Sequence, residues 1–174
     1  MTRDKLDELL NKIKQMSPLP DDEEMTEELI NEYVEVFEEI EEKYKDPRAI
    51  PVLIESLGIG EGYGVYQTVL SYLEHFNPED LLPHLFKAVQ HGPDGARKWG
   101  ARLLGTLRDN RALPYLLPLL NDPEEEVRIE SVIALEMIGD PAAIPGLQST
   151  QKNDSSMRVR KYAGEALEAL KNNS

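Results

Sequence analysis

The chain contains the segment Asp46-Pro-Arg-Ala-Ile-Pro51-Val-Leu-Ile, and three variants of it follow. The variants are Pro78-Glu-Asp-Leu-Leu-Pro83-His-Leu-Phe, Asp109-Asn-Arg-Ala-Leu-Pro114-Tyr-Leu-Leu and Asp140-Pro-Ala-Ala-Ile-Pro145-Gly-Leu-Gln. Their central prolines lie 32, 31 and 31 residues apart. Each segment opens a stretch with helical periodicity, and proline is tolerated in the first turn of a helix. A period of about 30 residues with helical content predicts an all-α solenoid of stacked helix pairs.

The four copies divide residues 46–174 into repeats that form one continuous domain. We expect the repeats to cover about 46–77, 78–108, 109–139 and 140–171. The second helices share one apolar pattern, which is found in Ala96–Leu107, Val127–Ile138 and Val159–Leu170, with a divergent copy over 62–73. In the third repeat, the positions expected to be buried are Val127, Ser131, Ala134, Leu135 and Ile138.

The second-helix pattern continues into the next proline segment, as in Val127-Arg-Ile-Glu-Ser-Val-Ile-Ala-Leu-Glu-Met-Ile-Gly-Asp-Pro-Ala-Ala-Ile-Pro-Gly-Leu147. This pattern resembles the HEAT repeat, in the short HEAT-like form that is named after phycobilisome lyases, and the resemblance covers residues 46–170. It implies a right-handed, curved stack whose second helices line the concave surface. It does not select a function, because lyases, hydroxylases, DNA glycosylases, scaffolds and toxin-neutralising immunity proteins all share the repeat.

Residues 1–45 differ from the repeats and predict an acidic helical hairpin that caps the stack. Residues 3–16 form its first expected helix, and Asp21 or Asp22 is expected to cap the second. One face of the second helix is almost wholly acidic. We predict that it steers a basic partner through Glu28, Glu32, Glu35, Glu39 and Glu42.

The composition restricts the function further. The net charge is −14, of which −10 falls within residues 1–44 and −4 within residues 45–174. Such a charge disfavours nucleic-acid binding and favours a basic protein partner. The chain has no cysteine, which excludes thiolate chemistry. No apolar run of about 20 residues predicts a membrane span, and the charged N-terminus is unlike a signal peptide, so we expect a cytoplasmic protein.

An exposed isoleucine pair marks the predicted binding surface. At about 100° per residue, Ile129 and Ile133 lie opposite the expected buried stripe of their helix, on the concave side that the resemblance implies. Apolar side chains within a polar rim concentrate binding energy. The predicted partner-binding residues are Lys98, Trp99, Arg102, Ile129, Ile133, Met137, Lys161 and Tyr162.

Other polar patterns favour structural roles. Arg97, Arg128 and Arg160 share one column of the repeat, and the resemblance implies that they bind acids and carbonyls at the turns. The segment Gly58-Ile-Gly-Glu-Gly-Tyr-Gly64 lacks the Lys-Ser/Thr of a phosphate loop, which favours a flexible loop between two helices. The histidines, His75, His84 and His91, have no metal-ligand spacing. We therefore predict no catalytic residue, no metal and no cofactor.

The sequence leaves three classes of function open. The first is a non-catalytic protein-binding module, monomeric in isolation, and within it a bacterial immunity protein that neutralises a basic toxin. The second is a lyase-type HEAT protein that handles a chromophore or another ligand. The third is a HEAT-like DNA glycosylase, which the acidic charge disfavours.

Overall fold

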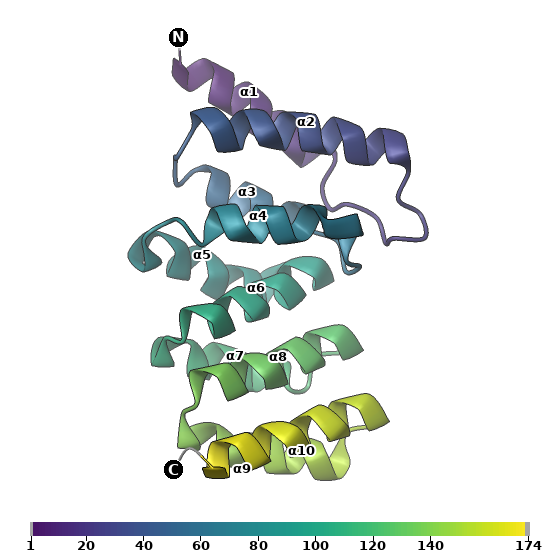
Figure 1. Ribbon diagram of the computed structural model, residues 1–174, viewed down its shortest axis with the longest axis vertical. Helices are drawn as coiled ribbons and strands as arrows, with labels where there is room; N and C mark the ends of the chain where they lie inside the picture. Colours follow the sequence, from purple (N-terminus) through teal and green to yellow (C-terminus); the bar gives the residue numbers. More distant parts are fainter. Residues whose placement is uncertain (1, 173–174) are drawn as a thin grey trace.

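The computed structural model describes residues 2–172, and helices dominate this part of the chain. The helices are α1 (Thr2–Gln15), α2 (Glu27–Lys43), α3 (Ala49–Ser56), α4 (Val65–Leu73), α5 (Pro78–His91), α6 (Asp94–Leu107), α7 (Leu113–Leu119), α8 (Glu125–Ile138), α9 (Ile144–Asn153) and α10 (Met157–Asn172). Consecutive helices pair into layers that stack along one axis (Figure 1). The predicted α-solenoid is confirmed. Among the described helices, none is long and apolar enough to cross a membrane.

The recurring proline segment has a local explanation. In the third and fourth repeats, Asp109 and Asp140 accept hydrogen bonds from backbone N–H groups two residues later, at 2.9 Å and 2.8 Å. Each bond caps a single 3-10 turn, Asn110–Ala112 or Pro141–Ala143, and the alanine that ends the turn is fully buried. The following helix then begins with proline in its first turn, where no N–H is required.

The column of arginines joins neighbouring repeats. Arg97 donates to both carboxylate oxygens of Asp122, at 2.7 and 2.9 Å, and Arg128 donates to both of Asp154, at 2.8 and 3.2 Å. Arg128 and Arg160 also donate to backbone carbonyls of the turns that precede their own helices. The structural role expected for these arginines is confirmed.

Helix α8 is buried over more of its circumference than the sequence predicts. Val127, Ser131, Ala134 and Leu135 are buried as expected, and Ile138 is half-buried. Ile129 and Glu130 are buried too, which was not expected. The reason is that α8 packs against α6 on one side and α10 on the other, as well as against α7. An exposed Ile129 was therefore a wrong prediction.

The N-terminal hairpin packs on the stack as an additional layer. Helix α1 contacts both α2 and α3, and α2 contacts α4. The Tyr33 hydroxyl forms a 2.7 Å hydrogen bond with the Ser56 hydroxyl, and the Tyr72 hydroxyl donates to the Tyr44 carbonyl at 2.6 Å. Helix α2 begins later than expected, because Thr26 caps it by accepting from the Leu29 N–H at 3.2 Å. The expected cap at Asp21 or Asp22 is wrong.

Candidate functional site

Helices α2, α4, α6, α8 and α10 lie along one side of the stack, with their first-helix partners behind them (Figure 1). We call this side the second-helix face. The predicted partner-binding residues belong to α6, α8 and α10 of this face, and they fall into two groups. The buried group is Lys98, Trp99 and Ile129, whereas the half-buried or exposed group is Arg102, Ile133, Met137, Lys161 and Tyr162.

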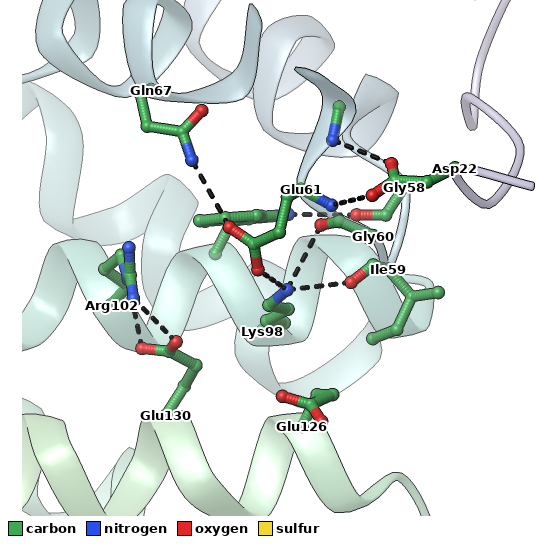
Figure 2. Close-up of polar contacts among 12 residues, drawn as sticks. Asp22, Gly58, Ile59, Gly60, Glu61, Gln67, Lys98, Arg102, Glu126 and Glu130 are labelled. Carbon is green, nitrogen blue, oxygen red and sulfur yellow. Dashed lines mark hydrogen bonds and ion pairs between the residues drawn. The ribbon is translucent and has the colours of Figure 1, made fainter. Parts of the chain in front are cut away.

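Lys98 is buried by the segment Gly58–Gly64, which we call the glycine loop. Only 3% of its side chain is exposed, and its ammonium donates to the carbonyls of Ile59 at 2.8 Å and Gly60 at 3.1 Å. The same nitrogen lies 2.7 Å from the Glu61 carboxylate (Figure 2). Lys98 thus balances the charge of Glu61 and holds the glycine loop in place. Its side chain is not accessible to a partner, so this part of the prediction was wrong.

Trp99 is fully buried beneath the glycine loop. Its indole N–H donates to the Gly58 carbonyl at 2.9 Å, and its ring meets Tyr66 edge to face at 5.7 Å. The absence of a side chain at Gly95 permits this close approach, since a β-carbon there would overlap with the Leu57 carbonyl oxygen and the Gly58 backbone. Trp99 is therefore a core residue and not an exposed anchor.

Asp22 holds the glycine loop from the opposite side. Its carboxylate accepts hydrogen bonds from the backbone N–H groups of Glu61 at 2.9 Å and Gly62 at 2.8 Å (Figure 2). The Tyr63 hydroxyl donates to the Asp22 carbonyl at 3.0 Å. The loop does connect two helices of one repeat, as predicted, but contacts from the α1–α2 turn and from α6 fix its conformation.

Tyr66 lies under the same loop with a buried hydroxyl that has no hydrogen-bond partner of acceptable geometry. Burial raises the pKa of Tyr66 to about 12; the backbone of Gly58 opposes this shift, and the carboxylates of Asp22 and Asp21 add to it. The phenol stays protonated at neutral pH and cannot act as a base there.

Arg102 pairs with a buried carboxylate on the next layer. Its guanidinium donates to both oxygens of Glu130, at 3.1 and 2.9 Å, and lies 5.2 Å from the centre of the Trp99 ring. The side chain of Glu130 is 6% exposed, whereas that of Arg102 is 40% exposed. One edge of the guanidinium therefore remains at the surface of the second-helix face.

Several apolar side chains on α8 and α10 of this face stay accessible. Ile133 and Met137 are half-buried on α8, Tyr162 is 36% exposed on α10, and Met157 at the start of α10 is 76% exposed. The sequence reasoning missed Met157. It lies four residues before Lys161, so it shares that residue's side of the helix, and this spacing could have identified it.

The predicted steering surface on α2 is present as an exposed acidic face. Glu28, Glu32, Glu35 and Glu42 are exposed, and Glu39 is half-buried, where it binds the Lys43 ammonium at 3.1 Å. Whether this face steers a partner stays a prediction.

The histidines do not form a site. The pKa of His84 is lowered by burial and by the nearby Lys87. Within residues 2–172, no group of three or more histidine or acidic side chains is arranged to hold a metal ion. A cavity of about 500 Å³ lies between the C-terminal end of α5 and α7. Val89, Tyr115 and Leu119 line part of it, and the predicted partner-binding residues do not.

Comparison with known proteins agrees with this architecture. A family model described as HEAT repeats matches residues 82–168, which run from α5 to α10. A curated protein, phycocyanobilin lyase subunit alpha from Picosynechococcus sp., is 38% identical over 72 residues, which are 40% of this chain and 27% of that protein. The chain thus aligns with only about a quarter of its relative. Because the family model covers half of the 174 residues, the chain belongs to the HEAT repeat family.

Proposed function

We propose that this chain is a non-catalytic scaffold that binds a protein partner through α8 and α10 of the second-helix face. The observation that carries the proposal is that α8 and α10 leave four apolar side chains half-buried or exposed among charged residues, namely Ile133, Met137, Met157 and Tyr162. Apolar side chains of this kind, when they gather inside a charged rim, are typical of protein-binding sites. HEAT repeats commonly mediate protein interactions, which supports the same class of function.

The rim of this surface carries both positively and negatively charged side chains. Arg158 contacts the carboxylates of Glu125 and Glu126 at 2.8 and 2.7 Å, and Lys161 lies 3.6 Å from Glu165. These pairs are exposed and contribute little stability, but they can exchange partners at small cost. A polar rim of mixed charge favours specificity over strength in a complex.

Within this class, we propose a basic partner, and specifically a toxin that the chain neutralises as a bacterial cytoplasmic immunity protein. The net charge of −14 and the exposed carboxylates of α2 support a basic partner, because they accelerate the encounter with a positive surface. The acidic helix lies on the same side of the stack as α8 and α10, so one partner can reach both (Figure 1).

The test is an affinity capture from the source lysate with the Ile133→Asp/Tyr162→Asp variant beside the wild type. We expect the wild type to retain a partner protein in stoichiometric amount and the variant to lose it. The two introduced aspartates would be buried against apolar side chains of the partner, which is unfavourable. Gln148→Asp/Ser149→Asp, on exposed positions of α9, introduces the same charge away from the face and should retain the partner. Equal capture by both variants, or no capture by the wild type, would contradict the proposal.

The relative supports a second candidate, the binding of a linear tetrapyrrole such as the phycocyanobilin in that protein's name. We expect any such binding to change the visible absorption of the pigment, since an apolar site alters its conformation and solvation. Titration of purified chain into phycocyanobilin measures this directly. An unchanged spectrum at micromolar protein would remove this candidate and leave the scaffold.

A further inference from the structure

The glycine loop presents one aromatic ring to solvent. Tyr63 is 68% exposed, which makes it the most exposed aromatic side chain among the described residues. Its φ of 48° lies in the left-handed region, between Gly62 at 61° and Gly64 at 93°. A third glycine would adopt this conformation more readily than tyrosine. A tyrosine therefore stands where the backbone favours glycine, and most of its ring faces water.

The loop holds this ring in a fixed position before any partner arrives. Its backbone is bound by Asp22 from the α1–α2 turn and by Lys98 and Trp99 from α6. The Tyr63 hydroxyl is tied to the Asp22 carbonyl. Because few conformations remain to be lost on binding, contacts with the ring are made at a low entropic cost.

The surroundings of Tyr63 are acidic. Asp21, Glu23 and Glu24 are exposed in the adjoining turn, and 60% of the Glu61 side chain is exposed in the loop itself. No lysine or arginine occurs within residues 15–42 or 49–86. Lys98 is buried beneath the loop, and the Arg102 guanidinium, which interacts electrostatically with Glu61, is already paired with Glu130. The ring therefore projects from a surface with a negative potential.

We propose that Tyr63 and the turn Asp21–Glu24 form a docking site for a cationic segment of the protein partner. This inference rests on the proposed scaffold function and names the chemistry of one segment that it binds. An arginine or lysine of the segment stacks on the Tyr63 ring, and neighbouring cations pair with the exposed carboxylates. Tyr63 lies two residues before the start of α4, so the site adjoins the second-helix face near its acidic end.

A titration with a fluorescein-labelled nona-arginine peptide tests this site without knowledge of the natural partner. We expect Tyr63→Gly to weaken binding about threefold, because it removes the cation–π contact at an exposed ring. Tyr63→Phe keeps the ring and should bind nearly as the wild type does. Glycine also suits the left-handed backbone, so Tyr63→Gly should remain folded, which a thermal scan verifies. Equal affinity for the Tyr63→Gly variant would overturn the assignment.

A matched pair of charge variants separates a local site from general attraction. Glu23→Gln/Glu24→Gln removes two exposed carboxylates beside Tyr63, and Glu41→Gln/Glu42→Gln removes two at the other end of α2. We expect the first variant to weaken peptide binding at low salt clearly more than the second; equal losses would show attraction to net charge alone and overturn the site. The Ile133→Asp/Tyr162→Asp variant should bind the peptide normally, so failure of this site and failure of the scaffold proposal are distinguishable.

Discussion

Replacement of Asp154 by alanine should lower the free energy of unfolding by about 3–5 kcal/mol. The Asp154 carboxylate is 7% exposed and receives both the bidentate Arg128 guanidinium, which is 11% exposed, and the Ser156 backbone N–H at 2.8 Å. Its loss leaves a buried cation without its counter-ion and leaves the Ser156 N–H, in the turn before α10, without its acceptor. Urea titration followed by circular dichroism at 222 nm measures the change.

Two further variants test the cause of this loss. Arg128→Met/Asp154→Ala removes both charges and should recover part of the stability, because the desolvation penalty of the isolated guanidinium disappears. Glu126→Ala breaks an exposed pair with Arg158 and should change stability by at most about 1 kcal/mol. If Asp154→Ala and Glu126→Ala had equal effects, the junction between the third and fourth repeats would not depend on this ion pair.

Replacement of Trp99 by alanine should lower the free energy of unfolding by about 3–5 kcal/mol. The side chain is fully buried, and its removal leaves a cavity, frees the Gly58 carbonyl and ends the contact with Tyr66. We also expect faster amide hydrogen exchange in the glycine loop, because one of its attachments to α6 is lost. Denaturant titration and hydrogen exchange measure the two effects.

Trp99→Phe is the matched control for this prediction. Phenylalanine retains most of the apolar contact but cannot donate to the Gly58 carbonyl, so its effect should be clearly smaller than that of alanine. A change of less than 1 kcal/mol for Trp99→Ala would contradict the burial of the indole and restore Trp99 as an accessible anchor.

The sequence predicted the features that recur with the repeat. The period of the proline segments predicted the solenoid, although the copies differ in detail. The third and fourth copies form the same capped 3-10 turn and helix start, whereas in the second copy α5 already begins at Pro78 and Pro83 lies inside it. The column of arginines was interpreted correctly for a related reason: a polar residue that returns at every repeat contacts the same groups of the next turn, as Arg97 and Arg128 do.

The sequence could not predict contacts that occur in only one of the repeats. The burial of Lys98 and Trp99 depends on a loop about 40 residues earlier in the chain, which local periodicity does not report. Ile129 was misplaced because one buried face was assumed for a helix that has neighbours on several sides. Asp22 looked like a helix cap, yet its carboxylate binds the backbone of Glu61 and Gly62, since Thr26 already caps α2.

The glycine loop affects how the N-terminal layer of the stack unfolds. In a solenoid whose layers touch only their neighbours, each terminal layer can detach by breaking one interface. Here Asp22 belongs to the first layer, the loop to the second and Lys98 to the third, so the loop is held from both of its neighbouring layers. We therefore expect detachment of the first layer to free one side of the glycine loop and so to weaken the loop's attachment to α6 as well.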